Sequence, residues 1–406
     1  MSAPNPGYLK VELALEGIDL DAAVCTRPEI RPGLAVPLGQ TPALELLLPE
    51  DVVVDAPVGK RNGAQRDQGR YQLGCEAARF FLHRGGEAAG ERVDVRVIPP
   101  PQFYGKHTLR GTPMREIATV FGNFIALSPV EACGFSLRHS PCRFCAGTAA
   151  AALSPRPVAE VIQTIRAALA EGAVEYVLFN GGGSDSEDGG VAALEPYISA
   201  VKRHFDTFVA VQVHPPQTNR WIDRTYAMGV DALSYGIEIH DPQRLLPLCP
   251  GRVARCGQAR YYEALAYAAT IFPSGTVWSD LLVGAEPSES TIDGMNQLTR
   301  AGVLPVLSLA RAGQPAQPRL AEIAPLFAHL FHAVRDAKIN MDWVQELSFG
   351  VTPLEARFFV AEEVRLSVTQ QFYRSRLGNL TARNLARLRR RLRVRTVSDS
   401  FDSSRL

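Results

Sequence analysis

From about residue 118 onward, short apolar runs alternate with longer amphipathic ones, and this alternation constrains the fold more than any other feature. Short runs rich in β-branched residues predict buried strands, and the amphipathic runs between them predict helices. Repeated strand-helix units are typical of a parallel sheet covered by helices. The expected strands are residues 118–127, 175–182, 208–215, 232–240, 276–284 and 304–310. Six such strands predict an α/β fold built on a partial (β/α)6 TIM-type barrel.

The chain divides into three expected parts around this barrel core. Residues 1–115 are rich in proline and glycine and predict a small α+β extension, with residues 116–315 forming the core. Residues 316–406 predict a helical C-terminal region, with one helix over 319–337 and a long helical stretch over 354–394. In the N-terminal part we expect strands in ALELLLP, DVVVDAPV and VDVRVIPP, and a helix in LGCEAARFFLHRGG.

Composition and charge narrow the classes of partner. The formal net charge is +1, so the chain as a whole gives no electrostatic reason to expect nucleic acid or an anionic membrane. No apolar stretch reaches the roughly 18 residues needed to span a bilayer, and the first residues do not have the pattern of a secretory signal. We therefore expect a cytoplasmic protein.

A local basic patch lies near the C-terminus, where seven arginines fall within residues 383–395. Leu385, Leu388 and Leu392 would share one face of a helix there. We expect that face to pack against the protein and the arginines to be solvated. Binding to nucleic acid or an acidic partner is the alternative.

Three of the seven cysteines, Cys133, Cys142 and Cys145, fall within thirteen residues after the first expected barrel strand. Clustered thiols in a reducing compartment more often bind metal or take part in chemistry than form disulfides. A structural zinc site needs four protein ligands, for which His139 is a possible fourth. An iron-sulfur cubane held by three cysteines would leave one iron open for another ligand. Both hypotheses remain open at this point.

The cysteine motif resembles that of the radical S-adenosylmethionine (radical SAM) superfamily, in which three cysteines spaced Cx3Cx2C follow the first barrel strand. Cys142, Phe144 and Cys145 match the second half of that motif, including the aromatic residue before the last cysteine. The first spacing is longer, with eight residues between Cys133 and Cys142 instead of three. The resemblance implies that Cys133, Cys142 and Cys145 hold a [4Fe-4S] cluster and that Phe144 shields it.

Further segments in barrel order extend the resemblance over about residues 118–315. The glycines of FNGGGSD, which follow the second strand, resemble the family segment whose backbone meets the methionine end of SAM. The family's glutamate is absent there, and Asp185 lies in its neighbourhood. The resemblance also implies that Glu238 contacts the ribose or amino group of SAM. The SAM contacts expected after the second strand are Gly181, Gly182, Gly183 and Asp185.

Other polar residues in the core are weaker candidates. Gln212 and His214 alternate along the third expected strand and would share one face, where they could contact SAM or substrate. Arg252, Arg255 and Arg260 follow the fourth strand, where the family places an arginine against the SAM carboxylate, and the sequence does not choose among them. Cys249 and Cys256 offer only two ligands, which is too few to define a second metal site.

The resemblance implies an enzyme that cleaves SAM reductively to a 5′-deoxyadenosyl radical, which abstracts hydrogen from a small-molecule substrate in biosynthesis. An electron donor such as flavodoxin or ferredoxin is the implied partner. Two alternatives stay open: a zinc-stabilised α/β binding protein without catalysis, and a cluster enzyme that transfers the aminocarboxypropyl group of SAM.

Overall fold

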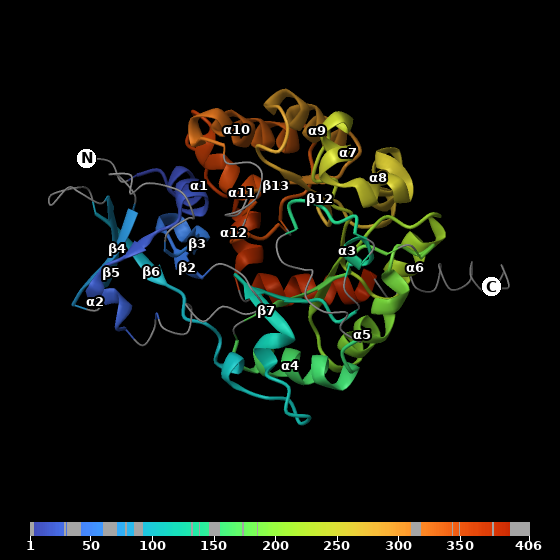
Figure 1. The fold of residues 1–406 in the computed structure, drawn as a ribbon, viewed down its shortest axis with the longest axis horizontal. Helices are drawn as coiled ribbons and strands as arrows, with labels where there is room; N and C mark the ends of the chain where they lie inside the picture. The colour runs from blue at the N-terminus through green and yellow to red at the C-terminus, as the bar shows by residue number, and fades with distance from the viewer. Residues whose placement is uncertain are drawn as a thin grey trace.

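The fold is known from a computed structural model that describes most of the chain. It covers residues 4–27, 30, 42–59, 71–77, 79–84, 92–130, 133–137, 139–145, 155–172, 174–184, 186–309, 318–342, 344–348, 350–375 and 377–389. Two β-sheets organise these residues, one of six strands near the N-terminus and one of eight strands after it. Figure 1 shows the smaller sheet beside the larger one, in blue.

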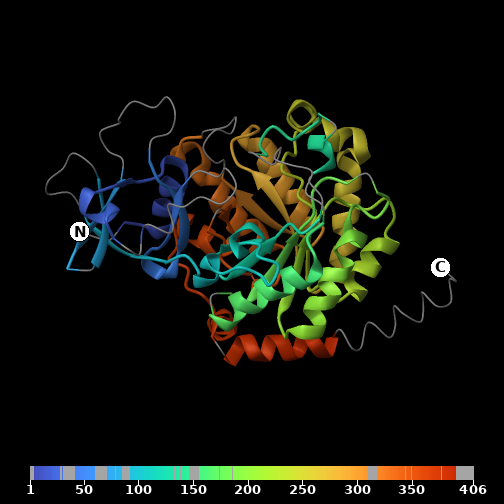
Figure 2. The same ribbon diagram turned by 60° about the horizontal axis from the view of Figure 1, so that its bottom comes forward.

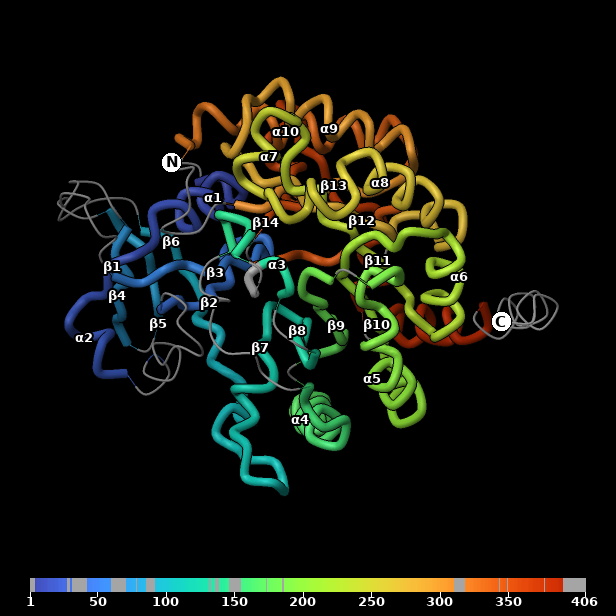
Figure 3. Tube along the Cα trace, turned by 45° about the vertical axis from the view of Figure 1, so that its right-hand side comes forward, coloured from blue at the N-terminus to red at the C-terminus, as the bar shows by residue number. Residues whose placement is uncertain are grey.

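The larger sheet confirms the expected core. Its strand order is β14-β13-β12-β11-β10-β9-β8-β7, and the six strands from β8 to β13 all pair in parallel. The edge strands β7 and β14 pair antiparallel. The sheet curls into a partial barrel (Figure 3). The strands are β7 (Ala118–Phe121), β8 (Phe124–Leu127), β9 (Tyr176–Asn180), β10 (Phe208–Gln212), β11 (Ala232–Ser234), β12 (Val277–Leu282), β13 (Leu304–Ser308) and β14 (Gly350–Val351).

Helices follow the parallel strands and cover the outside of the barrel (Figure 1). Proline and glycine mark several of the helix ends. Helix α8 begins at Pro250, and a glycine with positive φ follows shortly after the end of other helices, such as Gly229 after α6 and Gly302 after α9. None of the helices within the described ranges combines the length and the apolar character needed to cross a bilayer. The core helices are α3 (Gly134–Leu137), α4 (Val158–Ala170), α5 (Val191–His204), α6 (Arg220–Ala227), α7 (Pro242–Leu248), α8 (Pro250–Ile271) and α9 (Ser288–Arg300).

The first expected strand, 118–127, is two strands joined by a tight turn. β7 and β8 pair antiparallel, and Gly122 takes a φ of 57° in the turn between them. A left-handed residue is what a two-residue hairpin turn requires, and glycine adopts it without a steric penalty. The Gly-Asn pair at 122–123 was therefore the signal for this hairpin within the apolar run.

The N-terminal sheet agrees with the expected strands but not with the expected helix. The segment 73–86 forms a hairpin of β4 and β5 instead, in which Leu73 pairs with Leu82 and both are fully buried. Leu73 and Leu82 thus lie on the same buried face of the sheet. The packing of these side chains outweighs the helical propensity of the segment. The strand order is β1-β4-β5-β6-β2-β3. The elements here are α1 (Pro6–Glu16), β1 (Asp19–Leu20), α2 (Ala22–Cys25), β2 (Ala43–Leu47), η1 (Pro49–Asp51), β3 (Val53–Pro57), β4 (Tyr71–Glu76), β5 (Arg79–Arg84), β6 (Val93–Val97), η2 (Gln102–Gly105) and η3 (Met114–Glu116).

The two ends of the described chain share one hydrophobic core. Leu9 and Leu13 of α1 belong to the same buried cluster as Phe327 and Phe359. Lys10 and Glu355 form an ion pair with both side chains fully buried. The N-terminal part is therefore packed against the C-terminal region, and the expected boundaries at residues 115 and 315 stay predictions.

The C-terminal region is helical, as expected, but its last part is broken. The helix expected over 319–337 is α10 (Leu320–Asp336). The stretch expected over 354–394 divides into α11 (Pro353–Ala356), η4 (Arg357–Phe359), α12 (Val368–Arg374) and a helix over residues 377–389. Ser367 accepts a hydrogen bond from the Gln370 N–H and begins α12 anew, so one continuous helix was the wrong prediction.

The helix over 377–389 closes the end of the barrel where the strands begin. Asn379 donates from Nδ2 to Glu175 Oε2 at 2.5 Å, directly before β9, and Arg387 pairs with Asp206 ahead of β10. The prediction that its leucines pack inward is wrong, because Leu388 is 55% exposed and Ala382 only 3%. The buried side consists of small and polar residues, since those fit closely under the strand ends. Figure 2 shows this helix, in red, beneath the barrel. Leu392 lies outside the described residues.

The buried ion pair between Lys10 and Glu355 can be tested by its effect on stability. Replacing Lys10 by Met leaves the Glu355 carboxylate buried without its cation. We expect Lys10→Met to lower the free energy of unfolding by roughly 3 kcal/mol, because an uncompensated buried charge costs far more than a lost surface pair. Urea unfolding followed by circular dichroism measures the change.

The matched control is Lys106→Met. It removes an exposed pair in which Lys106 lies 3.2 Å from Glu171. Its effect should stay below about 1 kcal/mol. Equal losses in the two variants would contradict the structural role given to the Lys10–Glu355 pair.

Candidate functional site

The candidate site lies at the mouth of the barrel, where the parallel strands end. Cys133 follows β8, the glycines of FNGGGSD follow β9, and Glu238 follows β11. Because all six strands run the same way, the loops after them meet at one end of the barrel. The structure therefore brings together residues that are more than a hundred positions apart in sequence.

Cys142 is the centre of a small group of thiols. It is buried, and it accepts hydrogen bonds from the thiols of Cys145 and Cys249. Those bonds, with the nearby positive charge of Arg252, hold the pKa of the Cys142 thiol well below its usual range. The same bonds raise the pKa values of the Cys145 and Cys249 thiols. Sulfur is a preferred donor for soft metals, so a group of cysteines such as this one could bind such a metal.

Cys249 is a functional candidate that its position in the sequence associates with Cys256 and not with the cysteine cluster. It stands directly before α8 and is fully buried, whereas Cys256 lies seven residues further along that helix. The two loops are tied together, because the Arg143 N–H donates to the Leu248 carbonyl at 2.8 Å. Cys249 thus joins Cys142 and not a separate site with Cys256. Only the fold reveals this neighbour, because 107 positions separate the two cysteines.

Cys133 has a different partner. Its Sγ accepts a hydrogen bond from the Gly183 N–H at 3.1 Å. A Cβ on Gly182 would lie 2.7 Å from the Cys133 Cα, and one on Gly183 would lie 2.5 Å from the Phe135 ring. Two glycines are thus required for the loop after β9 to touch the cysteine loop. Gly181 is equally close to Val213, at 2.8 Å from its Cγ1.

Cys133, Cys142 and Cys145 are not arranged around a common metal position in this structure. In the described part of the chain, no three His, Cys, Asp or Glu side chains are gathered closely enough to hold a metal ion. The predicted ligand set of Cys133, Cys142 and Cys145 therefore stays a prediction, with Cys142 and Cys145 already in contact. Asp185 lies outside the described residues.

Arg252 is the arginine that faces the thiols. It donates from Nη1 to the Gly236 carbonyl at 2.6 Å, and its Nη2 lies 3.6 Å from Glu238 Oε1. Its Nε is buried and has no hydrogen-bond acceptor among the residues that the structure describes. Arg255 and Arg260 instead bind backbone carbonyls of Ser184 and Pro216. The structure thus selects Arg252 from the three arginines that the sequence left equal.

Glu238 is held in a strained conformation beside Arg252. Its φ is 65°, which is uncommon for a residue with a side chain and is found mainly where the surrounding structure enforces it. Its N–H donates to the Asp280 carbonyl, and its own carbonyl accepts from Leu282, both at 2.8 Å. These bonds fix the kinked backbone after β11 against β12. Burial raises the pKa of Glu238, and the charge of Arg252 opposes that rise.

Gln212 and His214 contact different parts of the site. Gln212 donates from Nε2 to Asp280 Oδ2 at 2.8 Å, within the barrel. The His214 ring packs edge-on against Phe135 at 5.0 Å, and its Nδ1 lies 2.6 Å from the Tyr261 hydroxyl. Burial lowers the pKa of His214 to about 3, so its ring is neutral. The shared face expected from strand alternation is interrupted, because β10 ends at Gln212.

Phe144 covers the thiols from one side. It is buried in a small apolar cluster with Cys142, Cys249, Ile239, Leu245 and Leu282. The Arg252 guanidinium lies 5.7 Å from the centre of its ring. This packing limits the access of water to the Cys142 sulfur, and the shielding of a metal cluster by Phe144 stays a prediction.

Comparisons with known proteins give weak similarities only. No family model matches the sequence, and no curated protein matches it. The SuiB protein of Streptococcus suis, solved with bound S-adenosylmethionine, is 13% identical with a TM-score of 0.41 over 54% of this chain and 46% of SuiB. Methylornithine synthase PylB is 14% identical with a TM-score of 0.41, over 64% and 85%. A radical SAM methyltransferase from Sphaerobacter thermophilus is 14% identical with a TM-score of 0.38, over 78% and 81%.

The chain spans about half the length of SuiB. All three TM-scores lie below 0.5, so the functional argument rests on the residues of this chain. The donor chemistry suits an iron-sulfur cluster or zinc, because thiolate sulfur is the preferred ligand of both. Among the described residues, the buried Nε of Arg252 has no hydrogen-bond acceptor, which is what a site for an anionic group would require.

The close approach of the two loops generates a test of the glycines. A methyl group on Gly182 would meet the Cys133 backbone, which cannot swing aside as a side chain can. We expect Gly182→Ala to lower the free energy of unfolding by roughly 1–3 kcal/mol and to reduce the metal that the protein takes up. Denaturant unfolding and metal analysis measure the two effects.

Gly105→Ala is the matched control, because a Cβ there would meet no atom within 4 Å. It should leave both quantities unchanged within error. A stable Gly182→Ala variant with a full complement of metal would show that the loops do not depend on this contact.

Proposed function

We propose that this chain is a radical SAM enzyme that holds a [4Fe-4S] cluster through Cys133, Cys142 and Cys145. The observation that carries the proposal is the pairing of Cys142 with Cys145 at the mouth of a six-stranded parallel barrel, beside a buried arginine and glutamate. When bound, the cluster would supply the electron that cleaves SAM to methionine and a 5′-deoxyadenosyl radical, which takes a hydrogen atom from a small-molecule substrate.

The residues of the site would then bind and orient SAM. Arg252 offers its unpaired Nε and would face the SAM carboxylate, and Glu238 would accept hydrogen bonds from the ribose or the amino group. Gly181, Gly182 and Gly183 present backbone without side chains and would lie along the methionine end, and the proposal includes Asp185, which follows them in sequence. Gln212, which contacts Asp280, and His214, which packs against Phe135, would contact SAM or substrate.

Exclusion of water is the second task of the protein. A carbon radical reacts with most C–H bonds, so the site must keep solvent and stray side chains away. The cluster of Phe144, Ile239, Leu245 and Leu282 forms an apolar wall around the Cys142 sulfur. The proposal includes a flavodoxin or ferredoxin as the electron donor and a cytosolic location.

A second candidate function is a zinc-stabilised protein without catalysis. The contact of Cys249 with Cys142 favours it, because Cys249 supplies a fourth thiol that the local sequence lacks. Four cysteines make a closed tetrahedral zinc site, which has no open position for another ligand. The two functions therefore differ in whether Cys249 is a ligand.

Cysteine variants decide between these functions. After anaerobic reconstitution we expect about four irons per chain, as a cubane requires, and release of 5′-deoxyadenosine from SAM under reducing conditions. Cys133→Ser, Cys142→Ser and Cys145→Ser should each lose most of the iron and the visible absorption, because a ligand is missing. Cys249→Ser should retain both.

Cys25→Ser serves as the control, because Cys25 is exposed and belongs to α2 in the N-terminal part. Loss of iron in Cys249→Ser would make Cys249 a protein ligand to the fourth iron and would overturn the proposed function. Wild-type protein that binds one zinc ion and no iron would establish the second candidate instead.

A further inference from the structure

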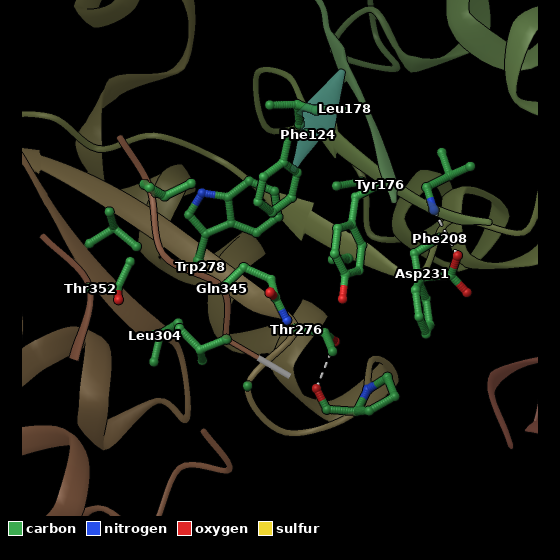
Figure 4. A pocket seen from close by; sticks show the side chains of 18 of the residues that line it. Phe124, Tyr176, Leu178, Phe208, Asp231, Thr276, Trp278, Leu304, Gln345 and Thr352 are labelled. Carbon is green, nitrogen blue, oxygen red and sulfur yellow. Dashed lines mark hydrogen bonds between the residues drawn. The ribbon is translucent and has the colours of Figure 1, made fainter. Parts of the chain in front are cut away.

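The barrel contains a cavity, partly open to its surroundings, that the proposed cluster site does not explain. Its volume is about 190 Å³, and it extends from the first residues of the strands up to Gln212 and Asp280. Figure 4 shows its lining, to which strands on opposite sides of the barrel contribute. The interior of such a barrel is normally filled by layers of side chains. This interior has a space where one or more of those layers would lie.

Three aromatic rings form one wall of the cavity. Phe124, Tyr176 and Phe208 occupy the same register on β8, β9 and β10, so their side chains stand next to one another. The ring centres of Phe124 and Tyr176 lie 5.1 Å apart with 30° between the planes. Those of Tyr176 and Phe208 lie 5.6 Å apart with 20° between the planes. Near-parallel rings at these separations stack on one another, so their edges and not their faces line the cavity.

Another aromatic side chain narrows the space. In Figure 4 the indole ring of Trp278, from β12, projects into the cavity, as do the rings of Phe124 and Tyr176. Flat rings bind other flat rings in offset or edge-on arrangements, with a gain beyond simple burial of apolar area. Because the positive edges of Phe124, Tyr176 and Phe208 line the cavity, they would pack against the face of another flat ring, which favours a planar aromatic ligand over a branched aliphatic one.

The C-terminal segments that close the cavity contribute two alanines beside the larger Tyr373 and Arg389. Ala382 and Ala386 of the helix over 377–389 line the cavity, and alanine leaves open the volume that a larger side chain would fill. Polar contacts such as the one between Asn379 and Glu175 hold that helix in place. The space therefore results from the small side chains at these positions and from the fixed place of the helix.

The roof of the cavity is polar and borders the cluster site. Asp280 accepts hydrogen bonds from Gln212 at 2.8 Å and from Ser308 at 3.2 Å. A Cβ on Gly236 would lie 2.7 Å from Glu238 Oε1 and 3.8 Å from Gln212 Nε2, so only this small residue separates the two groups. A ligand in the cavity would thus have one end beside the place assigned to SAM.

We propose that the cavity binds a planar aromatic small molecule that carries an N–H or O–H donor at the end near Asp280, and that this molecule is the substrate. The role as substrate rests on the proposed function, whereas the binding itself does not. Native interiors contain few voids larger than a water molecule, and an apolar cavity of roughly 150 Å³ stays dry and binds benzene. A cavity of about 190 Å³ with aromatic walls therefore accommodates one to two fused rings.

Indole is the probe for this proposal, because it is flat and carries a single N–H donor. Calorimetric titration of the full-length protein, both free of iron and loaded with its cluster, should detect saturable binding of indole. Cyclohexylmethanol, a non-planar molecule with an O–H donor, should bind at least tenfold more weakly. Equal affinities for the two probes would overturn the preference for a planar ligand.

Cavity-filling variants locate the binding. Ala232→Leu, on β11, and Ala386→Leu, on the helix over 377–389, each put a larger side chain into the cavity, and each should weaken indole binding at least tenfold. Ala193→Leu, at an exposed position of α5, should not change the affinity. Thermal unfolding checks that each variant is folded, and the two positions on different elements keep the test valid if one variant fails to fold. Unchanged affinity in a folded cavity variant would overturn the proposal.

The cluster assay separates this proposal from the proposed function. Saturable indole binding in protein that takes up no iron and cleaves no SAM would keep the cavity as a ligand site and would remove its role as a substrate site. Cleavage of SAM by protein that binds no indole would refute the cavity proposal alone.

Discussion

The buried charge of Arg252 is the constraint on which the rest of the candidate site depends. Its positive charge acts on both the Cys142 sulfur and the Glu238 carboxylate, and burial disfavours each of those groups in its anionic form. A buried charge is tolerated only when opposite charges and hydrogen bonds compensate it. The bond from Arg252 to the Gly236 carbonyl fixes its position relative to the kinked backbone at Glu238. The arrangement leaves Nε unpaired, so the compensation is incomplete within the described residues and one further acceptor would complete it.

Much of the fold could be predicted, because the signal is periodic and local. The six parallel strands were readable from apolar runs, since a strand buried on both faces needs apolar residues at nearly every position. The errors come from places where a short turn sequence lies inside a longer segment whose composition predicts a different element. The hairpin turn at Gly122 was hidden inside an apolar run, and the hairpin of β4 and β5 was hidden inside a sequence with helical composition. The helix over 377–389 packs by Asn379 and Ala382 because the strand ends offer polar partners and little room.

The candidate site was predictable only in part. Cys142 and Cys145 were readable because a two-residue gap is a local signature of metal binding. Cys249 was not, because its contact with Cys142 depends on how the segment between α7 and α8 returns to the cysteine loop. The choice of Arg252 over Arg255 and Arg260 has the same origin. The backbone breaks at Gly257 between Arg255 and Arg260, and only the packed structure decides which of the three arginines faces the thiols.

The barrel differs in character along its axis, although charged groups are found at both ends. Arg252, Glu238 and Asp280 lie toward the mouth, whereas Phe124, Tyr176 and Phe208 line the opposite end together with Asp231 and Arg389. Charged and apolar groups attract different parts of a ligand, so a molecule with a polar end and a flat apolar body has one favourable orientation in such a barrel. A fixed orientation brings one particular hydrogen atom near the polar end. Under the proposed function this positioning would choose the hydrogen atom that reacts, because a carbon radical has little selectivity of its own.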